Sequence, residues 1–159
     1  MSTKSDPDWS ALLGTIRLLG YGGLIPFAAL ALAAWGGTLP IDKSLCLTLL
    51  RAYGLAIVSF IGAISWGIAL VSGSLDIQKR KRLLLWSVTP SLIGFASFGM
   101  TAPVGCLVLA ATAALALLVD IRNTPSIGLP QSWRALRIHL SLGAIAALLS
   151  GAISAGLHG

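Results

Sequence analysis

Long apolar stretches, separated by short polar links, set the pattern of this chain. Residues 12–35, 49–73 and 136–157 each contain a single lysine, arginine or acidic residue over their whole length. An α-helix rises about 1.5 Å per residue, so about 20 residues cross the roughly 30 Å hydrocarbon core of a bilayer. The pattern therefore predicts a transmembrane helix in each of these stretches.

A further apolar stretch, residues 83–119, is too long for one crossing. As a single helix it would measure roughly 55 Å. Pro103 lies near its middle, and proline is favoured in the first turn of a helix. We predict two shorter spans, 83–100 and 103–119, joined by a tight turn. The following segment, 121–132, is rich in proline and glycine and is predicted to be a loop.

Composition supports this assignment. Hydrophobic residues make up 56% of the chain and charged residues only 10%, and the mean hydropathy is +0.89, whereas soluble domains carry roughly 25% charged residues. The predicted fold is all-α: a polytopic membrane protein with one domain, residues 1–159, of five transmembrane helices. The chain has no glutamate, and its five aspartates lie at the ends of the apolar stretches or outside them. Acid chemistry at mid-membrane is therefore not expected.

The first apolar stretch has an alternative interpretation as a signal peptide, because Ala31-Leu32-Ala33 resembles a cleavage site. The stretch is longer than a signal-peptide core, and acidic residues accompany the basic one that precedes it. We therefore favour an uncleaved first helix.

Basic residues predict the orientation of the bundle. Short loops rich in lysine and arginine stay in the cytoplasm. One side of the predicted bundle carries Lys4, Arg17, Lys79, Arg80, Lys81, Arg82, Arg122, Arg134 and Arg137, and the other carries only Lys43 and Arg51. The N-terminus is thus predicted to be cytoplasmic and the C-terminus periplasmic, in the inner membrane of a bacterium.

The net charge of +6 does not indicate a nucleic-acid partner. Nucleic-acid surfaces gather basic residues on one solvated face, whereas here they lie between apolar spans. The run 79–82 is interpreted as a topology determinant that contacts lipid headgroups.

Two charged residues near the cytoplasmic ends of spans are expected to pair with side chains of opposite charge. Asp120 ends the fourth span, where the helix dipole disfavours a carboxylate, and Arg17 lies about one turn inside the first. We predict a cytoplasmic ion-pair cluster drawn from Arg17, Asp76, Asp120, Arg134 and Arg137. Arg51, on the other side, is expected to extend toward the outer headgroups or to contact an anion there.

A small polar-lined pocket is the second candidate site. Pro26 and Pro90 lie inside spans, where each removes a backbone hydrogen bond and kinks the helix. Trp66 lies deeper than the other tryptophans, and Ser59 lies on the same span. These four residues are the candidate ligand-binding set. The alternative is that the serines simply bond to backbone carbonyls.

Small residues recur at four-residue spacing and predict close helix contacts, within the chain or between copies. They are Ala29, Ala33 and Gly37 in the first span, Ser59, Ala63 and Gly67 in the second, and Gly143, Ala147, Gly151 and Ala155 in the last.

Other reactive side chains give weak signals. Cys46 and Cys106 are both predicted near the outer face, either as a disulfide or as free thiols. His139 is interpreted as an interfacial hydrogen-bonding residue. No metal or cofactor is predicted, and no catalytic motif is recognised.

Several segments together resemble the transmembrane-protein-69-like family, a domain of unknown function in bacteria and mitochondria. They are Leu19-Gly20, Gly23-Leu24-Ile25-Pro26-Phe27, Ala52-Tyr53-Gly54, Ser59-Phe60-Ile61-Gly62, Trp66-Gly67, Ser87 with Pro90, and Trp133-Arg134-Ala135-Leu136-Arg137. The resemblance implies a small multi-pass membrane protein and no known activity. Ser65 departs from it, since that family often has arginine or histidine before Trp-Gly.

The leading functional hypothesis is a non-enzymatic membrane protein that binds other membrane proteins as an assembly or accessory factor, or pairs with itself. The alternative is a binder of a small ligand or lipid. The third hypothesis is a transporter or an enzyme. It ranks last because few charges are expected at mid-membrane and no inverted repeat is visible.

Overall fold

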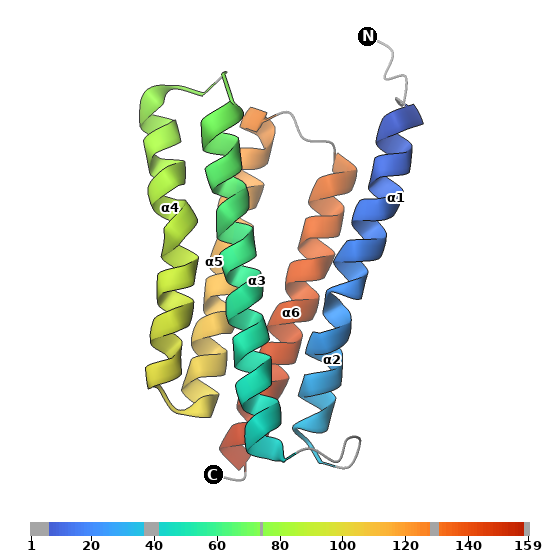
Figure 1. Cartoon of the computed structure of the whole chain (residues 1–159), viewed down its shortest axis with the longest axis vertical. Coiled ribbons are helices and arrows are strands. Elements are labelled where there is room, and N and C mark those ends of the chain that lie inside the picture. Colours follow the sequence, from blue (N-terminus) through green and yellow to red (C-terminus); the bar gives the residue numbers. More distant parts are fainter. Residues whose placement is uncertain (1–6, 37–41, 74, 128–130, 158–159) are drawn as a thin grey trace.

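A computed structural model describes residues 7–36, 42–73, 75–127 and 131–157, and its regular structure there is helical. The helices run side by side along one long axis, and α1 begins at the opposite end of the bundle from the end of α6 (Figure 1). They are α1 (Pro7–Gly22), α2 (Leu24–Ala33), α3 (Lys43–Val71), α4 (Ile77–Ala96), the short 3₁₀ turn η1 (Ser97–Gly99), α5 (Ala102–Ile127) and α6 (Gln131–Leu157).

The first predicted span is divided at Gly23 into α1 and α2. Pro26 accounts for the break, because its nitrogen has no hydrogen to donate and its ring clashes with the carbonyl four residues earlier. The Tyr53 hydroxyl of α3 donates to the Gly23 carbonyl at 2.9 Å. The Tyr53 ring also packs edge-on against Phe27, with 4.9 Å between ring centroids. The bent first span is thereby fixed to α3 at the bend.

Side chains cap both ends of α3. Asp42 accepts from the Ser44 amide at 3.0 Å, and hydrogen bonds from Ser44 lower the pKa of its carboxyl. This cap stabilises α3 at neutral pH and is lost as the pH falls through the lowered pKa. At the other end, Arg80 donates to the carbonyls of Ala69 and Leu70 at 2.7 and 3.1 Å. Arg80 therefore closes the end of α3 as well as carrying the positive charge predicted for that link.

The α3–α4 pair is the most extensive helix contact, together with α5–α6. It depends on Gly62, where the backbones approach so closely that a Cβ would overlap the Ser87 carbonyl oxygen. Pro90 is buried in the same contact. Small residues allow such close approach, and close approach supplies the packing that holds helices together in lipid.

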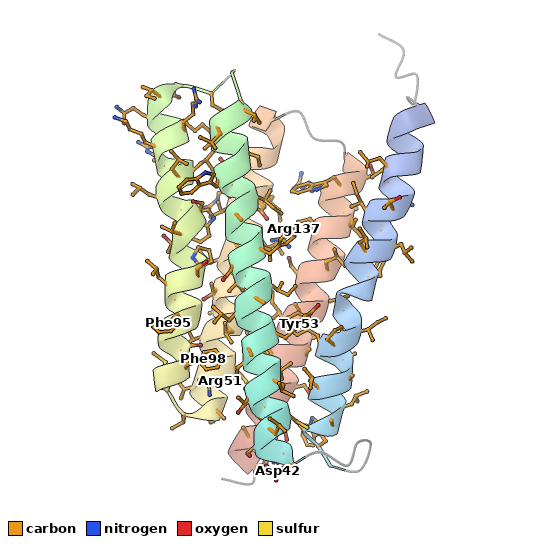
Figure 2. The ribbon with its side chains drawn as sticks, in the orientation of Figure 1. Asp42, Arg51, Tyr53, Phe95, Phe98 and Arg137 are labelled. Carbon is orange, nitrogen blue, oxygen red and sulfur yellow. The ribbon has the colours of Figure 1, made fainter. Side chains whose placement is uncertain are left out.

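The predicted tight turn between the third and fourth spans is present, with Pro103 in the first turn of α5. The structure contradicts the expected position of Arg51, which is 7% exposed and does not extend outward. Its guanidinium donates to the Ser97 carbonyl and, at 3.4 Å, to that of Met100. Its Cζ also lies 4.7 Å from the centre of the Phe98 ring (Figure 2). Arg51 binds the α4–α5 turn because the carbonyls there and the ring face offer acceptors for its charge.

The predicted loop at 121–132 is mostly helical, since α5 continues to Ile127 and α6 begins at Gln131. Two of the small residues predicted along the last span, Gly143 and Gly151, make close helix contacts within the chain. A Cβ at Gly151 would overlap Leu50, and one at Gly143 would lie 2.8 Å from Leu24. At the far end of α6, Ser154 donates to the Ala34 carbonyl at 2.6 Å. Cys46 and Cys106 are buried and are not joined in a disulfide.

Within the described residues, four helical stretches are long and apolar enough to cross a membrane: Leu12–Ala33, Lys43–Val71, Ala102–Asn123 and Ser132–Leu157. The helix α4, predicted as a span over 83–100, falls outside this group because four consecutive basic residues occupy its first turns. It nevertheless runs alongside α3 over the length of the bundle (Figure 1).

Candidate functional site

A cavity of about 510 Å³ lies between the first span, α3 and α6. It falls within the range of small-molecule sites, which are usually concave and mainly apolar. Most of its walls are isoleucine, leucine and phenylalanine side chains. Along α6 it reaches from Trp133 to Leu148, and along α3 from Gly54 to Ile64.

The cavity exists because small residues line it and because α1 leans away from α3 (Figure 1). Gly20, Gly23 and Gly54 contribute no side chains where three helices converge, and Ala113 and Ala144 contribute only methyl groups. The glycines also permit close packing, because a Cβ at Gly20 would lie 2.7 Å from Leu140 and one at Gly54 would lie 3.2 Å from Leu148.

One end of the cavity is polar. The Arg137 Nε donates to an Asp120 carboxylate oxygen at 2.7 Å, and the two side chains are 10% and 12% exposed. The Arg137 Nη1 donates to the Ser141 hydroxyl, one turn further along α6, at 2.9 Å. Both Arg137 and Ser141 line the cavity, and Figure 2 marks the position of Arg137 on α6. The Arg137 Nη2 is buried and has no hydrogen-bond partner among the described residues.

The residues of the predicted ion-pair cluster are only partly brought together. Asp120 pairs with Arg137. Asp76 instead caps α4, accepting from the Lys79 amide at 2.9 Å. Arg17 and Arg134 are exposed and lie outside the Asp120–Arg137 pair.

The four residues of the predicted ligand pocket do not converge. Trp66 is 47% exposed on the outside of α3, and Pro90 is buried between α3 and α4. Pro26 and Ser59 are partly buried, and none of the four lines the cavity. Pro26 acts on the site indirectly, by breaking the first span beside it.

Sequence reasoning missed the cavity, although α6 carries a signal for it. Trp133, Arg137, Ser141, Ala144 and Leu148 recur at spacings of three to four residues and so lie on one helix face. Along this face of α6 the side chains change from aromatic to charged, then to small and polar, and finally to apolar. That gradient is a pattern suited to a ligand with a polar head and an apolar body.

A second, more polar hollow of about 680 Å³ lies between the start of α4 and the end of α5. Lys79, Arg82 and Arg122 line it, together with Asp76. The indole nitrogen of Trp86, also in its wall, is buried with no hydrogen-bond partner among the described residues. The remaining basic residue of the run, Lys81, is exposed. This hollow suits contact with headgroups better than the enclosure of an apolar ligand.

His139 is exposed, with its Nδ1 3.4 Å from the Tyr21 hydroxyl. Among the described residues, no three histidine, cysteine or acidic side chains gather where they could hold a metal ion.

Apolar helices of membrane-crossing length, packed around an apolar cavity, define a helical membrane-type bundle. Within that class, residues 14–153 match the model of a family described as a protein of unknown function, DUF3429, and the chain belongs to this family. No curated protein matches the chain. No solved structure matches it either.

Proposed function

We propose that this protein binds an amphiphilic ligand of the membrane in the cavity between its first span, α3 and α6, and is not an enzyme. The observation that carries the proposal is the cavity itself, which is apolar over most of its wall and includes Arg137, whose guanidinium is paired with Asp120. The apolar part of such a ligand exchanges contacts with lipid chains for contacts with cavity side chains that are equally apolar. Its polar end meets hydrogen-bonding groups that bulk lipid chains lack.

The proposed setting is the bacterial inner membrane, with five crossings, a cytoplasmic N-terminus and α4 as the third span. The position of α4 beside α3 supports the fifth crossing. The basic run at its start supports the cytoplasmic side. The resemblance to the transmembrane-protein-69-like family is retained as part of this proposal.

Filling the cavity tests the proposal. Ala144 is buried in the cavity wall, whereas Ala146, on the same helix, is exposed and does not line it. After mild-detergent purification, native mass spectrometry of the wild-type protein is expected to show a retained lipid-sized ligand. Ala144→Phe is expected to lower its occupancy about tenfold or more, an effect of at least about 1.4 kcal/mol. Ala146→Phe is the matched control and should retain the ligand. Equal occupancy in both variants would contradict the cavity as the site.

A second candidate function is the binding of another membrane protein as an assembly or accessory factor, or of a second copy of this chain. It is favoured by the face of α3 that carries Ala63 and Gly67, both exposed, with no atom within 4 Å of a Cβ built at Gly67. Small residues on a lipid-facing surface permit close approach of a further helix. The same purification tests it, because recovery of the single chain, with no stoichiometric protein beside it, would count against this function.

A further inference from the structure

We propose that the cavity selects an amphiphile whose polar end is an uncharged oxygen acceptor, such as an ester carbonyl or a hydroxyl, bound by the Arg137 Nη2. This inference rests on the proposed function and specifies the chemistry of its ligand. It starts from a guanidinium that lines the cavity and has one nitrogen, Nη2, with no acceptor among the described residues.

The Arg137 Nη2 lacks an acceptor, but the guanidinium already has a counter-charge. Its Nε is paired with Asp120 at 2.7 Å, and its Nη1 bonds to Ser141 at 2.9 Å. Both members of the ion pair are close to nine-tenths buried. A buried guanidinium N–H without an acceptor is unfavourable, so a ligand that supplies only an oxygen lone pair completes the site.

An anionic head fits this site less well than an uncharged one. The Arg137–Asp120 pair is already neutral as a unit, so a carboxylate or phosphate would bring a net negative charge into a mostly apolar cavity. It would also lie close to the Asp120 carboxylate, which repels it. Burying a charge without its own counter-ion is much less favourable than burying a hydrogen-bonded neutral group.

The geometry also fixes the direction of the ligand. From Arg137 the cavity continues along α6 past Ser141 and Ala144 to Leu148, where its wall is apolar. On the other side of Arg137 it is lined by Trp133, one turn nearer the start of α6. The polar head therefore lies at Arg137, and the apolar chain extends toward Leu148 and the middle of the bundle.

The test uses the full-length protein in detergent, stripped of bound lipid, with monoolein and oleate as probes at pH 8. The two probes share one acyl chain, but the first ends in an uncharged glycerol ester and the second in a carboxylate. The wild-type protein is expected to bind monoolein at least about tenfold more tightly than oleate. Tighter binding of oleate would overturn the inference.

Two variants assign this preference to Arg137. Arg137→Lys keeps a positive charge for Asp120 but has no second planar nitrogen to offer. It is expected to weaken monoolein binding about tenfold while leaving oleate binding nearly unchanged. If Arg137→Lys does not fold, the double variant Arg137→Gln with Asp120→Asn removes both charges together. It should abolish the discrimination between the probes, and a double variant that still prefers monoolein tenfold would overturn the inference.

The outcomes separate this inference from the proposed function. If both probes bind equally, Ala144→Phe blocks both, and the Arg137 variants change neither, the cavity holds ligands but the acceptor preference is wrong. If neither probe binds the wild-type protein and native mass spectrometry shows no retained ligand, the proposed function itself fails, and this inference fails with it.

Discussion

Gly62→Ala is expected to destabilise the bundle more than any other single added methyl group on α3. A Cβ at this position would overlap the Ser87 carbonyl oxygen, and Pro90 Cδ would lie only 3.6 Å away. Neither neighbour yields easily, since one is backbone and the other belongs to a ring. The two helices must therefore move apart along their most extensive contact. Overpacking of this kind costs about 3 kcal/mol.

Gly67→Ala is the matched control for Gly62→Ala. Gly67 lies on the same helix, yet a Cβ built there meets no atom within 4 Å. In an exposed helical position, alanine is favoured over glycine by about 0.5–1 kcal/mol. Thermal unfolding in detergent should thus show a lower midpoint for Gly62→Ala and an unchanged or higher one for Gly67→Ala. Equal midpoints would mean that α3 and α4 do not approach as closely as described.

The second large effect is expected at Arg51, which holds the α4–α5 turn through the Ser97 carbonyl and the Phe98 ring. Arg51→Ala removes these contacts, leaves the Ser97 carbonyl without this donor and opens a void. Together these losses amount to about 3 kcal/mol. Arg51→Lys is expected to recover only part of the loss, because an ammonium cannot bond the carbonyl and stack on the ring with one planar group. The measurement is again the unfolding midpoint.

Gly105 supplies an independent test of the same contact. A Cβ there would lie 2.5 Å from the Arg51 Nε and 2.7 Å from its Cζ, so Gly105→Ala must displace the guanidinium. Gly99, in the neighbouring turn, has no atom within 4 Å of an added Cβ and is the control. A midpoint for Gly105→Ala equal to that of Gly99→Ala would show that Arg51 does not pack against α5.

The sequence was sufficient to predict the helices whose length matches the thickness of a bilayer. Length and the absence of charge were sufficient for the four apolar spans, and the preference of proline for a first helical turn located the turn before Pro103. The Asp120–Arg137 pairing could be anticipated from the matching depths of the two residues. The expected helix end at Asp120 was wrong, because α5 continues to Ile127.

Depth alone does not give the direction in which a side chain points. Arg51 was expected to extend outward because its depth allowed it, but its face of α3 is turned toward Gly105 and the α4–α5 turn. Trp66 has a depth suited to a pocket, yet its side chain is 47% exposed and does not line the cavity. The rotation of each helix depends on packing against its neighbours, which no local pattern specifies.

The cavity was harder still to anticipate, because it arises from the angle between α1 and α3 (Figure 1). The Pro26 kink indicated a bend, but the lean of α1 depends on how Tyr53 holds the Gly23 carbonyl. The sequence does not show which glycines border a cavity. Gly54 and Gly62 both permit close packing on α3, and Gly54 also lines the cavity.

The five proposed crossings determine the depth assigned to each residue, including those at the polar end of the cavity. Single cysteines introduced at Gly73 and at Thr101 flank α4, in a background where Cys46 and Cys106 are replaced by serine. In intact cells, a membrane-impermeant thiol reagent is expected to label Thr101→Cys and to leave Gly73→Cys unlabelled until the membrane is broken. Labelling of both from the same side would mean that α4 does not cross the membrane and would contradict the account.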